Sequence, residues 1–405
     1  MKKSTKLMTV AIILLISISA CLIKFLLLKG DKEVNAKSKL IFFDLTSKGN
    51  ATLVQSVDKQ GNPIYGIIDG GKPINYSNDI EPYLIENNIK KLDFLIVSHM
   101  DVDHVGGVQE LLNSEYVNKD TTLYIKITSK SKGLVNGVKN KEMNIAVVEP
   151  VTAPENIKTN REVMNAPDSV FQTKIKYYSK ADNYTNATEC ENFSFGEFTI
   201  TIYNGIDWNS QDVVDEDWDE NVNSLTCLLE RKNSKGELQR IYIGSDLGEN
   251  SGEDSSEDHL QYSMVIGERV SQIVGQVDVY MVAHHGFYFS MNEATAKNLN
   301  FQYAIVTNSY EEIAYKGIKK FKKKYPNLND TEALDIGSNT LQALCASERL
   351  KNIFFTDGEN YGKKTAYEII KECQASSGYV LTDDKGCIRN GNVTVELESD
   401  IKIYQ

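Results

Sequence analysis

The order of apolar and polar segments along the chain predicts an α/β fold. An apolar run at 92–97 has the pattern of a buried strand, and a polar loop connects it to a helical pattern at 108–112. A second apolar strand, at 277–283, leads directly into a His-His-Gly sequence. Short apolar runs separated by turn residues fill 40–71, as in strand hairpins. The 405 residues suffice for one α/β domain of about 250–300 residues with insertions.

The N-terminal residues predict a membrane anchor or signal segment over 1–30. Three lysines among the first six residues precede an uncharged run from Leu7 to Ile23, which is long enough to cross a bilayer. These lysines favour a single-pass protein of the cell membrane with an extracytoplasmic domain. A cleaved signal peptide, which would give a secreted protein, is one alternative. A lipoprotein modified at Cys21 is another.

Composition divides the rest of the chain. Residues 31–39 are a polar linker, and 40–360 hold the main domain. Within it, 129–184 is rich in lysine and asparagine with little periodicity, which indicates an insertion. Residues 361–405 form a C-terminal extension that includes short strands. The net charge of −12 argues against general polyanion binding unless a basic patch is local.

The loop after the first buried strand carries four side chains that can ligate a metal ion. They are His99, Asp101, Asp103 and His104, and they include two of only five histidines in the chain. Imidazole nitrogens and carboxylate oxygens together suit zinc or manganese. The alternative is a polar loop whose acids only cap the following helix.

Three further positions place polar side chains at the ends of apolar strands. Asp246 follows the strand at 240–243, and a buried acid there needs a cationic partner. His284 and His285 directly follow the strand at 277–283. The sequence does not decide which of the two binds metal and which faces substrate. Asp69 lies before two glycines, where it either supports the metal loop or caps a turn.

The His-x-Asp-x-Asp-His-x-Gly-Gly pattern of 99–107 resembles the signature loop of the metallo-β-lactamase superfamily. Its second Asp makes it similar to the metallo-β-lactamase-like domain of ComEC competence proteins. The segments 42–54, 244–246 and 282–286 resemble that domain too. The resemblance implies a four-layer αβ/βα sandwich, with two sheets face to face and helices outside.

The same resemblance implies a site with one or two divalent metal ions, Zn or Mn. The metal ligands it implies are His99, Asp101, Asp103, His104, Asp246 and His284. Asp103 and His285 would be the catalytic residues. Most of the superfamily has another histidine ligand where this chain has Asn223 and Ser224, so the first metal position is expected to be weakly held.

The resemblance implies a metal-dependent hydrolase, and the N-terminal segment makes it a membrane-tethered, extracytoplasmic one. It would be a phosphodiesterase or nuclease that uses metal-bound hydroxide, with DNA as the implied substrate. A single apolar segment cannot form the many-helix channel of ComEC proteins, so this chain is not expected to move DNA across a membrane. The alternatives are a hydrolase of a cell-surface phosphodiester polymer such as teichoic acid, and a catalytically inactive binding module. Six lysines near the predicted helix 315–325 either contact phosphate or form a solvated face.

Overall fold

The structure is a computed structural model. It describes residues 36–150, 160–178, 187–206, 220–248, 257–357 and 391–405. The predicted membrane segment 1–30 lies outside this part of the chain, as do 31–35 of the linker and 361–390 of the C-terminal extension. Within the described residues, no helix combines the length and the apolar character needed to span a bilayer.

Ten strands of the described residues form the first sheet. Its central strands are parallel because helices connect them, and hairpins extend the sheet on both sides. The spatial order is β17 (Ile401–Tyr404), β16 (Val393–Leu397), β1 (Ser38–Phe42), β2 (Thr52–Val57), β3 (Pro63–Ile68), β4 (Phe94–Val97), β5 (Thr122–Ile125), β6 (Asn144–Pro150), β7 (Thr173–Tyr178) and β8 (Ala187–Cys190).

Seven strands form the second sheet, again counting the described residues. Its parallel part runs from β12 to β15, and its antiparallel part from β9 to β12. The spatial order is β15 (Asn352–Asp357), β14 (Tyr303–Ser309), β13 (Val279–Met281), β12 (Leu238–Ile243), β11 (Thr226–Lys232), β10 (Phe198–Tyr203) and β9 (Asn192–Phe195).

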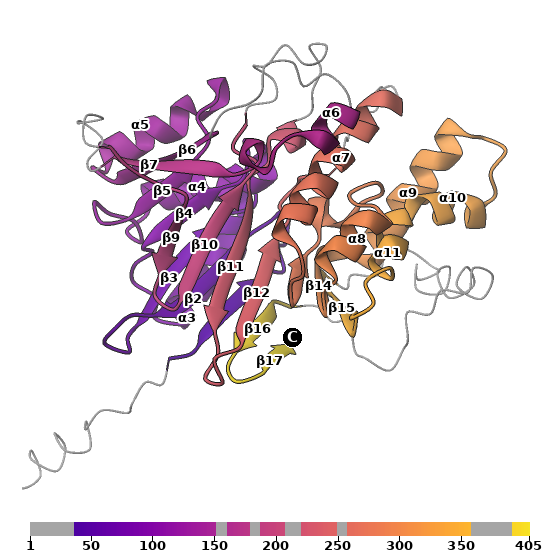
Figure 1. Cartoon of the computed structure of the whole chain (residues 1–405). Helices are drawn as coiled ribbons and strands as arrows, with labels where there is room; N and C mark the ends of the chain where they lie inside the picture. The colour runs from indigo at the N-terminus through magenta and orange to yellow at the C-terminus, as the bar shows by residue number, and fades with distance from the viewer. Residues whose placement is uncertain (1–35, 151–159, 179–186, 207–219, 249–256, 358–390) are drawn as a thin grey trace, which may run out of the picture.

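Helices cover the outer faces of both sheets (Figure 1). The first sheet packs against α3 (Glu81–Glu86), α4 (Val102–Asn113) and α5 (Lys132–Asn140). The second sheet packs against α7 (Glu257–Val274), α8 (Glu293–Leu299), α9 (Tyr310–Lys324), α10 (Asp330–Gly337) and α11 (Asn339–Leu344). Shorter helices lie between strands: α2 (Pro73–Asn75), η1 (Tyr76–Ile80), η2 (Ser129–Ser131), α6 (Asn160–Asn165), η3 (Asp168–Val170), η5 (Glu220–Asn223) and η6 (Ala283–Gly286).

The two sheets face each other across one apolar core. Leu40 and Phe42 of the first sheet lie in the same buried cluster as Ile200, Leu229 and Ile241 of the second. Two separate clusters fill the spaces between each sheet and its helices. The expected α/β architecture of helix, sheet, sheet and helix layers is therefore present, built from mixed sheets.

The segment expected to be an insertion and the segment expected to be a C-terminal extension both contribute strands to the first sheet. Residues 129–184 supply β6, which is parallel to β5, and β7, which pairs with β6. In the C-terminal extension, β16 is antiparallel to β1 and buries Val393, Val395 and Leu397 between the sheets. The described parts of both segments therefore belong to the layered fold.

The carboxyl ends of the parallel strands meet at one edge of the sandwich. In the first sheet these are the ends of β3 and β4, and in the second those of β12 and β13. Polar side chains that follow parallel strands gather at such an edge, which is the usual place for a site in open α/β sheets.

Candidate metal centre

Both sheets contribute to a cluster of histidines and aspartates at this edge. From the first sheet, His99 follows β4, and Asp103 and His104 lie in the first turn of α4. From the second sheet, Asp246 follows β12, and the His284–His285 pair lies in η6 directly after β13. The sequence predicted all of these positions from apolar strands that end in ligand-type residues.

The two glycines of α4 allow that helix to start against the turn that follows β3. A Cβ atom on Gly107 would lie 1.9 Å from the backbone oxygen of Gly70, closer than any side chain tolerates. Gly70 N donates to His104 O at 2.8 Å, and Gly107 N donates to Gly71 O at 2.8 Å. This close backbone contact brings His104 next to Asp69.

The carboxylate of Asp246 is the centre of the cluster. Its Oδ1 lies 3.0 Å from His104 Nε2. Its Oδ2 lies 3.9 Å from His99 Nε2, 3.8 Å from His284 Nε2 and 3.7 Å from His285 Nε2. One buried acid of the second sheet thus lies within 4 Å of four imidazoles, two of them from the first sheet.

The two other aspartates of the loop lie on different sides of this cluster. Asp103 Oδ2 is 3.7 Å from His285 Nε2. Asp101 Oδ2 is 3.6 Å from His99 Nε2, and its side chain is 41% exposed. The structure therefore brings every predicted site residue together, with Asp101 at the solvent side.

Two groups of three ligand atoms are compact enough for a metal ion. One consists of His99, His104 and Asp246, and the other of Asp103, His104 and His285, with all ligand atoms of a group within 4.8 Å of one another. The Nε2 atoms of His99 and His285 are buried and make no hydrogen bond. Because buried polar atoms without partners are rare, these nitrogens fit a bound cation.

The negative charge of Asp246 and the positive charge of His104 each stabilise the charged form of the other side chain. Burial lowers the pKa of His104, but the carboxylates of Asp246 and Asp69 outweigh burial and raise that pKa well above its usual value. Burial raises the pKa of Asp246, yet the neighbouring imidazoles, led by that of His104, hold it well below its usual value. Burial also lowers the pKa of His285, which favours the neutral, metal-binding imidazole.

Asp69 supports the metal loop, the first of the two roles that its position suggested. Its carboxylate accepts hydrogen bonds from Ser98 N at 2.8 Å and Ser98 Oγ at 2.7 Å. Asp69 Oδ2 also lies 2.8 Å from His104 Nδ1. With Nδ1 of His104 directed at Asp69, Nε2 points toward Asp246 and is the ring nitrogen placed to bind a cation.

The backbone is strained at several of these positions. The φ angles of Asp69, Ser245, His284 and His285 are 58°, 47°, 45° and 54°, a region in which non-glycine residues are uncommon. Each costs of order 1 kcal/mol or more and persists where the surrounding structure imposes it. Such strain is concentrated at functional sites, and here it directs His284 and His285 toward Asp246.

Comparison with known proteins assigns part of the chain to a family. Residues 46–120 match the family model described as "Metallo-beta-lactamase superfamily". These residues are therefore similar to the corresponding part of a metallo-β-lactamase superfamily domain. The matched residues include Asp69 and the loop from His99 to His104, and they end before Asp246. No curated protein matches the sequence.

Solved structures that resemble this chain do so distantly. The metallo-β-lactamase MIM-1 from Novosphingobium pentaromativorans is 11% identical, with a TM-score of 0.33 over 84% of this chain and 88% of that one. A long form of RNase Z from yeast is 12% identical, with a TM-score of 0.36 over 82% and 39%. The flavodiiron protein from Giardia intestinalis is 10% identical, with a TM-score of 0.29 over 86% and 89%.

Two residues of the candidate metal centre were not predicted from the sequence. Asn50 Nδ2 donates to Asp246 Oδ1 at 3.1 Å, and Asn50 Oδ1 accepts a hydrogen bond from Thr307 Oγ1. Thr307 Oγ1 in turn lies 3.2 Å from His285 Nδ1. These contacts connect Asp246 to His285 through two buried side chains. The one signal in the sequence was a polar residue at a strand boundary, which is too common to identify a site.

The turn of Asn223 and Ser224 lies beside the metal loop. Leu225 N donates to Ser98 O at 2.9 Å, next to His99. Lys126, which follows β5 at the same edge, is buried and donates from Nζ to Asn223 O at 2.7 Å. Ser224 Oγ is buried without a hydrogen bond. The turn therefore has the location expected for it, with a neutral hydroxyl in place of an imidazole.

Proposed function

We propose that this chain is a metal-dependent hydrolase that acts on phosphodiesters. One observation carries the proposal: buried Nε2 atoms of His99 and His285 make no hydrogen bond and lie within 3.9 Å of the Asp246 carboxylate. The similarity of residues 46–120 to part of a metallo-β-lactamase superfamily domain supports hydrolytic chemistry. A divalent cation bound here would supply Lewis-acid polarisation of a phosphoryl oxygen and a water molecule of lowered pKa.

The distances favour specific roles for these residues. His99, His104 and Asp246 would hold one cation, and Asp103, His104 and His285 would hold a second. In this arrangement His285 is a ligand, and the more exposed His284 holds a proton on Nε2 for an oxygen of the substrate. Asp101, at the solvent side, would contribute least to metal binding.

Support for a phosphodiester substrate comes from the site's ligands. Aspartate in place of a second histidine makes the ligand set harder, and hard oxygen ligands suit Mn²⁺ or Zn²⁺ that handles phosphate oxygens. DNA and a cell-surface polymer such as teichoic acid both remain candidates. The net charge of −12 opposes the binding of a long polyanion unless lysines gather near the site, and α9 carries the chain's predicted lysine cluster.

The deciding assay compares the wild type with Asp103→Ala on four substrates, with added Mn²⁺ or Zn²⁺. The substrates are single-stranded DNA, a chromogenic phosphodiester, poly(glycerol phosphate) and a β-lactam. We expect metal-dependent cleavage of a phosphodiester that Asp103→Ala lowers by about 100-fold or more, because a ligand and its charge are lost. Turnover of the β-lactam alone would refute the phosphodiester proposal.

A binding module that keeps the fold without catalysis is the second candidate. The measurement that separates it from an enzyme is the metal content of the purified chain after reconstitution with zinc or manganese. A chain that retains neither metal would favour the binding module.

We also propose that residues 1–30 tether the domain outside the membrane, as the lysines before the apolar run suggest. Protease added to intact cells should then degrade the domain. Complete protection would contradict this orientation, and a block in maturation by Cys21→Ala would favour a lipoprotein instead.

A further inference from the structure

The segment after the His-His-Gly sequence consists of three aromatic residues, Phe287, Tyr288 and Phe289. The Phe287 ring lies 5.6 Å from the ring of His284 and 6.1 Å from that of His285, measured between centroids. All three aromatic side chains are partly exposed. This aromatic segment therefore extends from the candidate metal centre toward the protein surface.

Two lysines of α9 are held on the rings of this segment. Lys316 Nζ lies 4.6 Å from the centroid of the Phe287 ring, and Lys320 Nζ lies 4.4 Å from that of Tyr288. Their i, i+4 spacing places both on the same face of α9. A cation over an aromatic ring gains about 0.5–1 kcal/mol at an exposed site, so the rings favour these positions of the ammonium groups.

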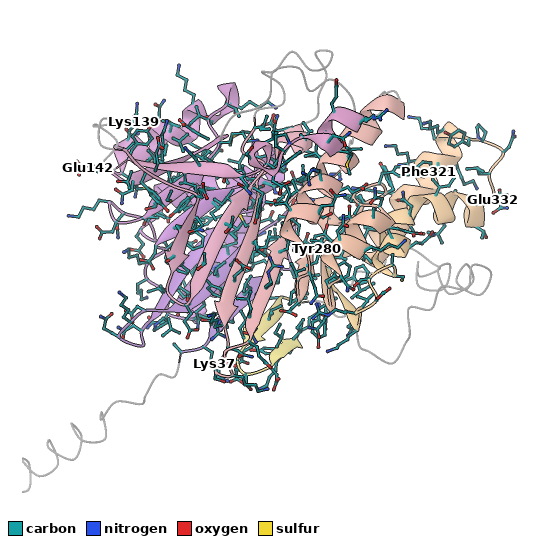
Figure 2. The ribbon with its side chains drawn as sticks, viewed as in Figure 1. Lys37, Lys139, Glu142, Tyr280, Phe321 and Glu332 are labelled. Atoms are coloured by element: carbon teal, nitrogen blue, oxygen red, sulfur yellow. The ribbon has the colours of Figure 1, made fainter. Side chains whose placement is uncertain are left out.

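The aromatic segment itself is fixed by the same helix. The ring of Phe321, on α9, meets the rings of Tyr288 and Phe289 edge to face, at 5.3 Å and 6.0 Å between centroids. Figure 2 labels Phe321 among the side chains of the C-terminal helices. The contacts with Phe321 keep α9 and the segment at a set distance, so the positions of Lys316 and Lys320 relative to the metal centre are set as well.

A third lysine approaches from the first sheet. Lys48 Nζ lies 2.6 Å from Glu312 Oε1, and Lys316 Nζ lies 2.9 Å from the same oxygen. Burial raises the pKa of Glu312, but the two ammonium groups outweigh burial and keep that pKa below its usual value. Lys48 is two residues from Asn50, which hydrogen-bonds Asp246. Two ammonium groups, those of Lys48 and Lys316, thus share one carboxylate, and Lys320 lies one helical turn beyond Lys316 over the ring of Tyr288.

The remaining lysines of α9 do not share this arrangement. Lys322 forms an ion pair with Asp330, and Lys324 lies over the ring of Tyr325. Lys316 and Lys320 differ from them in location, because the rings that they contact belong to the aromatic segment, whose Phe287 lies beside His284 and His285.

We propose that Lys48, Lys316 and Lys320 form a subsite for a second phosphate group of the substrate, next to the phosphodiester that is hydrolysed. The proposal rests on the proposed function, and it makes that function selective for chains of repeated phosphates. Ammonium groups that are already positioned lose less side-chain entropy when a phosphate binds. The local positive charge also offsets the repulsion that a net charge of −12 exerts on a polyanion.

The test uses the double variant Lys316→Ala/Lys320→Ala in the full chain. The matched control is Lys323→Ala/Lys324→Ala, which removes the same charge from the same helix farther along. Binding of a fluorescent single-stranded DNA oligonucleotide is measured with EDTA present, over a range of salt concentrations. We expect the first variant to weaken binding by about 10-fold and to reduce the salt slope by one to two, and the control to change both much less.

A competition arm identifies the source of the phosphate. Unlabelled poly(glycerol phosphate) that displaces the oligonucleotide from the wild type would show that phosphates suffice, whereas no displacement would restrict the subsite to nucleic acid. If both variants weaken oligonucleotide binding equally, or if neither variant weakens it, the proposal is overturned. Circular dichroism must show that both variants fold.

The phosphate-subsite proposal and the hydrolase proposal fail in different ways. If the oligonucleotide is cleaved, its kcat/KM relative to that of the chromogenic single phosphodiester should fall by about 10-fold in Lys316→Ala/Lys320→Ala. An unchanged ratio would overturn the subsite while leaving the hydrolase intact. If no phosphodiester is cleaved but binding still depends on these two lysines, the hydrolase proposal falls and the phosphate subsite stands.

Discussion

Asp246 holds the site together at the level of single residues. Its carboxylate is buried, accepts a hydrogen bond from Asn50 and lies within 4 Å of four imidazoles. A carboxylate in such a place is stable because the opposite charges around it offset its loss of hydration. Asp101 also faces a histidine, but solvent hydrates it. Asp246 and Asp101 should therefore contribute very differently to the affinity for a cation.

Asp246→Asn keeps the shape of the side chain and removes its charge, so it tests this difference directly. We expect the variant to lower the affinity for Zn²⁺ or Mn²⁺ by about 100-fold or more, since changes outside the ligand set alone cost about 10–100-fold. Asp101→Asn is the matched control and should cost less than about 10-fold. Metal affinity is measured by competition with a chelating indicator. Equal losses in the two variants would argue against a central role for Asp246.

The residues found from the sequence and those missed differ in chemistry. Histidines are rare in this chain, so His99, His104 and the His284–His285 pair were conspicuous after apolar strands. Asn50 and Thr307 are of types common in turns and strands. Their role depends on a contact between residues 257 positions apart, which no local pattern reveals.

At the level of elements, the start of α4 depends on its contact with the turn after β3. The backbones of Gly70 and Gly107 touch with no space for a side chain, and this contact sets the distance from His104 to Asp69. The glycines of the loop are therefore a packing requirement. Neither Gly70 nor Gly107 has a positive φ angle, so their role here is close packing.

Gly107→Ala should strongly destabilise the chain, because the new Cβ would lie 1.9 Å from Gly70 O and the backbone has to move. A loss of about 3 kcal/mol or more in the free energy of unfolding is expected, as for other large steric conflicts. The control is Gly133→Ala in α5, where a Cβ meets nothing within 4 Å and helix propensity favours alanine by up to about 1 kcal/mol. Urea unfolding measures both, and similar midpoints would contradict the packing argument.

Most strands near the site were predictable from the sequence, whereas the pairing of strands within each sheet was not. The apolar runs predicted at 92–97, 240–243 and 277–283 correspond to β4, β12 and β13. The pairing of β16 with β1 joins opposite ends of the chain, for example Val395 with Leu40, and depends on tertiary packing. For the same reason β6 was not recognised within its polar surroundings, although it continues the parallel part of the sheet beside β5.

At the level of the whole molecule, the site lies between the two sheets. His99 and His104 belong to the first sheet, and Asp246 and His285 to the second. Hydrogen bonds from Asn50 to Asp246 and from Thr307 to Asn50 already cross between them. A cation bound by ligands of both sheets would link the two halves of the sandwich, so metal binding and global stability should be coupled.

The coupling predicts a rise in melting temperature when metal is added. A ligand that binds only the folded chain stabilises it by about 2.7 kcal/mol at 100 times its dissociation constant, which for a chain of this size is a shift of several degrees. Differential scanning calorimetry with added Zn²⁺ or Mn²⁺, and then with excess chelator, measures the shift and its reversal. Asp246→Asn should lose most of it, because the second sheet no longer offers a charged ligand to a cation held by His99 and His104. If Asp246→Asn shows the same shift in melting temperature as the wild type, the stabilising metal binds elsewhere. In that case a metal at this site does not couple the stabilities of the two sheets.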